Sequence, residues 1–260
     1  TTSLFIYDIS GEKAYLFKKA YEERYARKPT WLGACYYDAV RVAVEAIKRA
    51  EIGDEDIRKA RKMVRDTLAG MNERDMGIQG LGGDIYFDEN GDLRRPVSVG
   101  FYEKRRFVPA FWQYPFTTSV PKETLKGEMT QIVRVVVYIN KVSNFNMRNG
   151  TYTLDFYLGF FGEGAFDPSR IRFSNAVNPI TLGQPVLEDA PDGKHAFLYR
   201  VKADFKNDFD FHSYPFDDHD LYIRLYHEDR NRGRLIFAPL TPRNRVAEDK
   251  HDLSGWEISN

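Results

Sequence analysis

The chain has 260 residues, a length that fits one or two globular domains. Its 38 basic and 38 acidic residues cancel to a formal net charge of zero, and no basic tail is present, so the composition does not favour nucleic-acid binding. The single cysteine, Cys35, excludes an internal disulfide. No apolar run in the sequence approaches the roughly 20 residues that span a bilayer.

Residues 1–115 have the pattern of an α/β domain. The apolar residues 4–7 predict a short strand. A helix begins near Glu12, with Ser10 as its N-cap, and ends before Pro29. A second helix is expected over residues 31–50, and a third over residues 55–70 with Asp54 as its cap. The second helix has a broad apolar face that we expect to be buried together with Cys35: Ala34, Ala39, Val42, Ala43, Ala46 and Ile47.

The period then changes from helix to strand. Residues 85–87 and 97–102, separated by the turn residues 88–92, predict a β-hairpin. Residues 116–126 follow without periodicity, in a stretch where Pro115 and Pro121 stand close together, and we interpret them as the linker between two domains.

Residues 127–260 predict an all-β domain. Residues 131–140 and 151–161 alternate apolar and polar residues, which predicts a hairpin with a long loop over residues 141–150. Further short strands are expected, which together favour a β-sandwich: 171–173, 195–204, 221–226, 234–237 and 256–258. One strand face is expected to be buried: Tyr152, Leu154, Phe156, Leu158 and Phe160.

An apolar and acidic turn interrupts this domain: Tyr214-Pro215-Phe216-Asp217. Proline excludes a central strand position, and the Tyr214–Pro215 bond is a candidate for the cis form. The aromatic residues favour burial and Asp217 needs a polar partner, so we expect the turn to dock on another part of a larger protein. The chain also begins and ends within strand-like stretches, and we therefore expect it to be a piece of a longer one.

Five segments of the second half occur in the order and at the spacing of one known family: Val137-Tyr138-Ile139-Asn140, Gly150-Thr151-Tyr152-Thr153-Leu154-Asp155-Phe156-Tyr157-Leu158, Ile171-Arg172-Phe173-Ser174-Asn175-Ala176, Phe209-Asp210-Phe211 with Tyr214-Pro215-Phe216-Asp217, and Gly255-Trp256-Glu257-Ile258. Residues 127–260 thereby resemble the extracellular domain of prokaryotic pentameric ligand-gated ion channels, in the Cys-loop receptor superfamily. The resemblance implies an immunoglobulin-like sandwich that lacks its last hairpin. His219 departs from the family, where most members have Gln.

The first half carries softer motifs: residues 17–25, Lys28-Pro29, Tyr36-Tyr37-Asp38-Ala39-Val40, residues 44–47, and residues 82–88 with Asn90-Gly91-Asp92. Residues 1–110 thereby resemble the C-terminal part of a type I periplasmic binding protein of the branched-chain amino acid type. The resemblance implies a partial lobe of that fold, with the first lobe and most of the ligand cleft absent.

The channel resemblance also implies sites. It places ligand-binding positions at Asn175, Tyr226, His227, Glu228, Arg230, Tyr157, Phe160 and Tyr199. It places the loops that couple binding to a membrane domain at Asn144, Asn146, Tyr214, Pro215, Phe216 and Asp217. An aromatic cage favours an amine, whereas Arg230 and Glu228 suit an amino acid or carboxylate equally well.

The sequence offers little support for an enzyme or for a metal or other cofactor. It contains no G-x-S-x-G motif, and no Gly-Lys-Ser/Thr follows the Gly-rich residues 80–83. His212, Asp217, Asp218, His219 and Asp220 are residue types that bind metals, but the channel resemblance already accounts for this segment. We therefore predict neither a catalytic residue nor a cofactor.

The two resemblances predict the periplasmic or extracellular region of a bacterial membrane receptor. It would bind a small amino acid or amine, couple binding to a membrane domain beyond the C-terminus, and assemble as a homopentamer. Two alternatives stay open: an ABC-type amino acid solute-binding protein, and the periplasmic sensor region of a signalling receptor.

Overall fold

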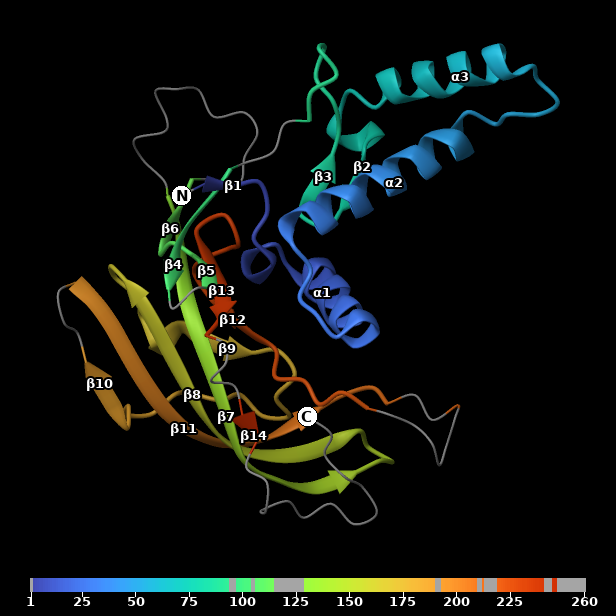
Figure 1. Cartoon of the computed structure of the whole chain (residues 1–260). Helices are drawn as coiled ribbons and strands as arrows, with labels where there is room; N and C mark the ends of the chain where they lie inside the picture. Colours follow the sequence, from blue (N-terminus) through green and yellow to red (C-terminus); the bar gives the residue numbers. More distant parts are fainter. Residues whose placement is uncertain are drawn as a thin grey trace. The chain divides into compact units, whose positions relative to one another are not determined.

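The computed structural model describes residues 2–93, 97–103, 106–114, 129–189, 193–209, 212, 219–240 and 245–246. The chain divides into two compact units, Thr1–Met129 and Thr130–Asn260 (Figure 1). The first unit contains helices and short strands, and the second is a largely antiparallel β region.

Three helices of the first unit lie close to where the sequence predicts them: α1 (Glu12–Tyr25), α2 (Trp31–Arg49) and α3 (Ile57–Gly70). Two predicted caps are wrong. Gly11 is the N-cap of α1, and the Ser10 hydroxyl instead donates to the Ile6 carbonyl. Asp56, not Asp54, caps α3, because its carboxylate accepts from the Arg58 N–H at 2.7 Å.

The buried face of α2 is narrower than predicted. It is a single line of residues four positions apart: Ala34, Asp38, Val42 and Ala46. Ala39, Ala43 and Ile47 are exposed and Cys35 is half-buried, so these four assignments to the core are wrong. Described neighbours of α2 within this unit include helix α1, helix α3 and the hairpin of β2 (Ile78–Gly80) and β3 (Gly83–Ile85). An apolar residue on another side of the helix therefore stays in solvent.

The strands of the first unit pair differently from the prediction. Residues 4–7 form no strand; β1 covers Thr2–Ser3, and Tyr7–Ile9 form the 3-10 helix η1. β3 pairs with β2, whereas β4 (Ser98–Glu103) pairs with β1 and with β5 (Arg106–Pro109). Among the described residues of the predicted hairpin 85–102, the pairing is therefore reduced to one bridge, Phe87 with Leu93, across the 88–92 turn. Strand β6 covers Trp112–Gln113, and the buried Gln113 amide bonds the Val99 backbone.

A buried carboxylate connects α2 to the β2–β3 hairpin. Asp38 is 3% exposed and accepts a hydrogen bond from the Leu81 N–H at 2.9 Å. Leu81 packs with Phe5, Ala14 and Ala34 in a small core. This acceptor therefore fixes the tip of the hairpin against the helix.

Replacing Asp38 with Ala should destabilise the first unit by about 1–3 kcal/mol, because the buried Leu81 N–H would lose its acceptor. Asp38→Asn is the matched control, since its amide oxygen can still accept this bond. Hydrogen exchange of the Leu81 amide measures the effect, and equal protection in the two variants would contradict it.

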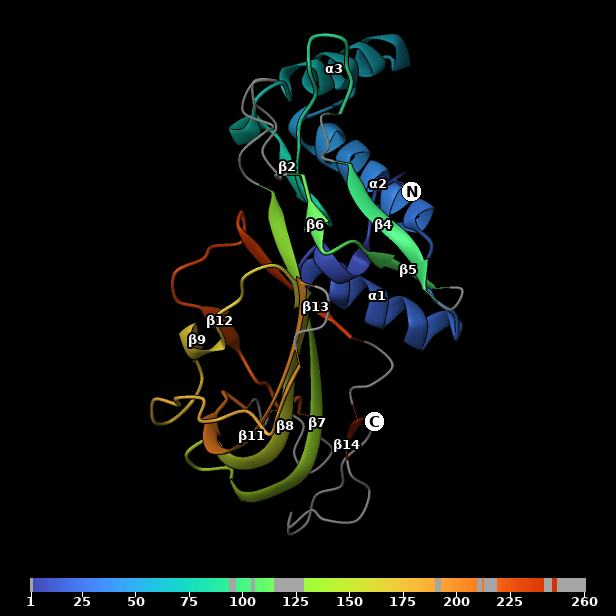
Figure 2. The same cartoon turned by 90° about the vertical axis from the view of Figure 1, so that its left-hand side faces the viewer.

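The second unit is built on three long antiparallel strands: β7 (Thr130–Asn146), β8 (Thr151–Glu163) and β11 (Lys194–Lys206). The strand order is β10-β11-β8-β7-β13, where β10 covers Leu187–Asp189 and β13 covers Leu235–Pro239. β13 and the short β14 (Arg245–Val246) run parallel to β7. A separate pair, β9 (Ile171–Phe173) with β12 (Leu225–His227), lies on one face of this sheet (Figure 2).

The hairpin of β7 and β8 is confirmed, but its loop is much shorter than predicted. β7 continues to Asn146, so most of residues 141–150 belong to the strand. Register shifts after Ile139 and after Ser143, with Asn144 at φ 51°, re-aim the side chains. Val142 thereby enters the core with 1% exposure, and burial of its side chain favours continuation of the strand.

The core of the second unit lies between the main sheet and the β9–β12 pair. The alternating face of β8 is buried as predicted: Tyr152, Leu154, Phe156, Leu158 and Phe160 are each at most 1% exposed. Ile171 and Phe173 of β9 and Phe205 of β11 belong to the same cluster. The 3-10 helix Pro168–Arg170 leads directly into β9.

The strand predicted over residues 221–226 is only partly present. Burial alternates along it, but the strand itself covers only Leu225–His227. Asn175 accounts for the difference: its amide donates to the Tyr222 carbonyl at 2.7 Å and its oxygen accepts from the Arg224 N–H at 2.9 Å. These side-chain bonds satisfy backbone groups that a strand partner would otherwise pair.

Several predictions fall outside the described residues. They concern the linker 116–126, the Tyr214-Pro215-Phe216-Asp217 turn with its cis bond, and the strand 256–258.

Gly150 is required by the turn between β7 and β8. It has φ +66°, and a Cβ there would lie 2.2 Å from the Asn207 carbonyl oxygen. Gly150→Ala should therefore destabilise the second unit by about 1–3 kcal/mol. Gly183→Ala is the control, because a Cβ at Gly183 meets nothing within 4 Å. Chemical denaturation measures both variants, and equal unfolding midpoints would contradict the expectation.

Candidate ligand-binding site

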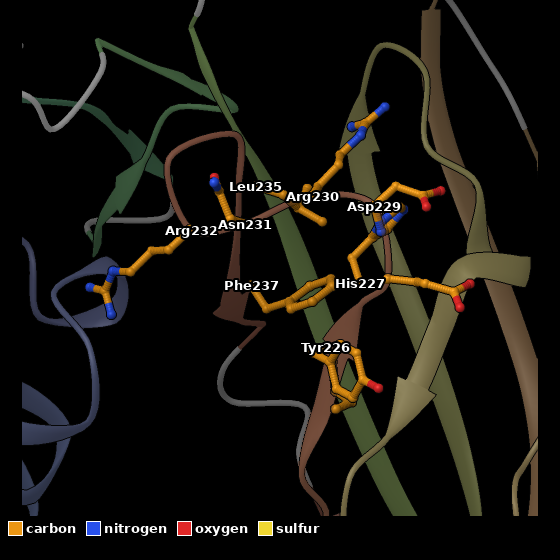
Figure 3. Close-up of a pocket in the computed structure, with 10 residues that line it drawn as sticks. Tyr226, His227, Asp229, Arg230, Asn231, Arg232, Leu235 and Phe237 are labelled. Atoms are coloured by element: carbon orange, nitrogen blue, oxygen red, sulfur yellow. The ribbon is translucent and has the colours of Figure 1, made fainter.

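An open pocket of about 510 Å³ lies in the second unit at the junction of β12 and β13. Figure 3 shows Arg230 and Asp229 above His227 and Phe237, with Tyr226 below them. The lining residues come from the two strands and the segment that joins them: Leu225, Tyr226, His227, Glu228, Asp229, Arg230, Asn231, Arg232, Leu235 and Phe237. A single short stretch of chain therefore supplies both the floor and the rim.

Asn231 shapes the joining segment. Its side-chain oxygen accepts from the Gly233 N–H at 3.0 Å, and its carbonyl accepts from the N–H groups of Arg234 and Leu235. Asn commonly folds the backbone in this way. The turn directs the chain back into β13. Leu235 and Phe237 of this strand thereby form an apolar wall of the pocket beside the charged residues.

The two acidic residues of the rim are paired with arginines of the β9 region. Glu228 contacts Arg172 at 2.6 Å and Arg170 at 3.3 Å, and Asp229 contacts Arg170 at 2.8 Å. The Glu228 N–H also donates to the Arg170 carbonyl. All four side chains are substantially exposed, so each pair contributes little stability, about 0–1 kcal/mol. Their main effect is to orient the rim.

Arg230 is held by neutral acceptors. One terminal nitrogen donates to the Gln131 side-chain oxygen at 2.5 Å, and the other donates to the Ala165 carbonyl at 3.2 Å. Gln131 is 1% exposed, and its amide in turn donates to the Glu163 carbonyl. Among the described residues, no carboxylate forms an ion pair with Arg230.

His227 and His195 pack against the ring of Phe166 beneath the pocket. The ring centroids lie 6.0 Å and 5.2 Å from that of Phe166, and both histidines are 6% exposed. The His227 Nδ1 accepts from the Asp229 N–H at 3.2 Å, so its neutral ring carries the proton on Nε2. The His195 Nδ1 lies 3.0 Å from the Gly164 carbonyl and therefore donates to it. In the described part of the chain, neither Nε2 has a hydrogen-bond partner.

Burial lowers the pKa of both histidines below the ordinary 6.5. For His195 the hydrogen bond to Gly164 opposes this effect, and for His227 the positive charge of Arg230 adds to it. Protonation would place a charge in a largely apolar site, which disfavours the charged form.

The structure brings together four of the eight predicted ligand-binding residues: Tyr226, His227, Glu228 and Arg230 line the pocket. The other four lie elsewhere. Phe160 and Tyr199 belong to the core, Tyr157 packs beside Tyr138, and Asn175 holds the 222–224 backbone.

Of the predicted coupling residues, Asn144 and Asn146 are described. The Asn144 amide donates to the Thr153 hydroxyl, and the Asn146 oxygen accepts from the Asn149 N–H. Both therefore stabilise the β7–β8 hairpin locally. Tyr214, Pro215, Phe216 and Asp217 lie outside the described residues.

Sequence reasoning missed several residues of the site. Asn231, Arg232, Leu235 and Phe237 line the pocket, while Gln131 and Phe166 support it from distant positions. The lining residues that follow Tyr226 in the sequence could have been predicted, because Asn231 and Gly233 are typical turn residues and indicate that the chain folds back there. Gln131 and Phe166 could not, because only tertiary contact relates them to Arg230 and His227.

Comparison with known proteins does not assign this chain to a family. No protein-family model matches the sequence, and no curated protein is similar to it. Of the helices that the structure describes, none combines the length and apolar character that a membrane span needs. Within the same residues, no cluster of His, Cys, Asp and Glu is arranged to hold a metal ion.

The two buried histidines predict a stability that depends on pH. Their pKa values are lowered in the folded state, so below pH 6.5 the unfolded chain binds more protons and stability falls as pH decreases. The lowered pKa values of Asp155 and Asp167 act at lower pH, near the ordinary 3.8.

Urea unfolding between pH 5 and pH 7.5 measures this dependence. The free energy of unfolding should be nearly constant above pH 7 and decrease from pH 6.5 to pH 5, the window set by the ordinary pKa of 6.5. The double variant His195→Gln, His227→Gln should flatten the decrease, with His212→Gln as the control. An unchanged slope in the double variant would contradict the assignment.

Proposed function

We propose that this chain is the extracytoplasmic ligand-binding region of a bacterial receptor related to pentameric ligand-gated ion channels. The observation that carries the proposal is the pocket beside β12 and β13, where Tyr226, His227, Glu228 and Arg230 meet. It combines an apolar floor with a few polar groups on its rim, the usual character of a small-molecule site.

The fold of the second unit supports the proposal. A long antiparallel hairpin, a third long strand and a small strand pair enclose one aromatic core. We infer an immunoglobulin-like sandwich of the channel extracellular type, in which loops at the ends of a rigid sheet carry the function. The residues from 127 to 260 are proposed as this domain.

The first unit is proposed as part of a periplasmic-binding-protein-like lobe. Its helices pack with short strands, and the motif Tyr36-Tyr37-Asp38-Ala39-Val40 places a buried acceptor, Asp38, beneath a glycine-rich hairpin. A module of this kind would contribute a second solute-binding function to the receptor.

Ligand binding would act by shifting an equilibrium between two conformations. The pocket segment leads into β13, which pairs with β7, and β7 continues to the Asn144 and Asn146 region. We propose that this strand passes the change to a membrane domain. A homopentamer would form through head-to-tail interfaces.

A thermal-shift screen of amino acids and small amines on the full chain tests the proposed function. A ligand at 100 times its dissociation constant should add about 2.7 kcal/mol to the free energy of unfolding and raise the melting temperature. Tyr226→Ala should abolish the shift, because the exposed Tyr226 ring faces the pocket. Tyr36→Ala, at an exposed position of α2, is the control. A shift that survives in Tyr226→Ala would exclude this pocket as the site.

A further inference from the structure

We propose that the pocket takes an anion, a small carboxylate, with Arg230 as its charged contact. This inference rests on the proposed function, because it names the chemical class of ligand for the same pocket. It decides between the amine and the carboxylate that the sequence leaves open.

The acidic residues of the rim already have cationic partners. Glu228 contacts Arg170 and Arg172, and Asp229 contacts Arg170. An incoming ammonium group would have to compete with these guanidinium groups, which are fixed beside the carboxylates by the β9–β12 pairing. The rim therefore offers no carboxylate whose charge is still unpaired.

Arg230, unlike the rim carboxylates, has no partner of opposite charge among the described residues. Its two described hydrogen bonds go to an amide oxygen and a backbone carbonyl, so its positive charge has no carboxylate partner among the described residues. Gln131 is buried and is itself held by the Glu163 carbonyl, which fixes the guanidinium without neutralising it. A guanidinium held in one orientation suits a carboxylate, whose two oxygens it can contact together.

His227 is a buried member of the pocket wall. Its ring is 6% exposed and lines the pocket, and its Nδ1 is occupied by the Asp229 N–H. Nε2 therefore carries the proton, and this donor has no partner in the part of the chain that the structure describes. This nitrogen is itself inaccessible to solvent, so His227 forms part of the pocket wall and does not contact a ligand through this atom.

The aromatic residues of the pocket do not form a cage for a cation. Tyr226 is half-exposed, while the Phe237 ring packs against Phe160 and Phe166 at centroid distances of 6.2 and 6.4 Å. Phe237 thus serves the core, and one open ring gives a weak cation–π site. The open Tyr226 ring suits the apolar part of a carboxylic acid equally well.

The test compares two probes of matched size on the ¹⁵N-labelled full chain. Sodium propionate and propylammonium chloride are titrated at equal ionic strength, and the side-chain N–H signals of arginine and histidine are followed. Propionate should shift the Arg230 Nε–H and His227 ring signals saturably, whereas propylammonium should not. Arg230→Gln should weaken propionate binding about tenfold or more, the loss expected for a charged hydrogen-bond pair.

Two further variants guard against misfolding and nonspecific charge effects. Arg148→Gln removes an equal charge from the exposed β7–β8 turn and should leave propionate binding unchanged. Arg230→Lys keeps the positive charge but lacks the paired N–H donors of the guanidinium, so this variant should bind propionate more weakly than the native chain. Equal loss in Arg148→Gln and Arg230→Gln would overturn the inference.

Saturable propylammonium binding at these residues, without propionate binding, would overturn the inference but leave the proposed function intact. If neither probe shifts the pocket signals, the carboxylate assignment fails. The thermal-shift screen then tests separately whether the pocket binds any ligand, because it uses amino acids and amines as ligands and Tyr226→Ala as the variant.

Discussion

Burial of one face of β8 is the constraint on which the second unit depends. Tyr152, Leu154, Phe156, Leu158 and Phe160 are nearly inaccessible to solvent, and full burial of such side chains contributes about 1.5–3 kcal/mol each. Because strand side chains alternate, a slip of one residue would move this whole set to the solvent face. The register of β7 and β11 on either side of β8 follows from this requirement.

The pocket owes its position to the same core. Phe237 and Leu225 pack against the cluster from β13 and β12, and Phe166 joins it beside His227. The floor of the pocket is therefore the edge of the core, while the charged rim lies on the segment between two anchored strands. Such an arrangement places polar groups on a rigid support, the usual condition for a specific site.

Charged and neutral polar side chains of this protein are paired in different ways at the surface and in the interior. The arginines and carboxylates of the rim pair near the surface, where water lowers the cost of their charges. Buried polar groups are instead joined by short hydrogen bonds, as for Gln131 with Arg230 and Asp38 with Leu81. His195 and His227 differ from this pattern, since one nitrogen of each ring has a hydrogen-bond partner and the other has none within the part of the chain that the structure describes. Burial lowers the pKa of both rings, so a fall in pH changes the energy of the unit at these two positions.

The sequence alone determined the larger elements. Helical spacing located α1, α2 and α3, and alternation located β7, β8 and β11 with the buried face of β8. Local turn chemistry was less reliable: Asp56 replaced Asp54 as a cap, and bulges extended β7 through a predicted loop. These differences of a few residues arise because several nearby residues can satisfy the same local rule.

Tertiary structure alone decided which elements meet. The Gln131 contact with Arg230 joins residues 99 positions apart, and Asn175 replaces a strand partner for residues 222–224. No local pattern carries such information, because the contacts depend on how distant strands stack. Four of the predicted ligand-binding residues therefore appear together along one stretch of chain, whereas Phe160 of β8 and Tyr199 of β11 belong to the core. The sequence shows that a side chain is apolar or charged, but only packing decides whether it faces the core or a pocket.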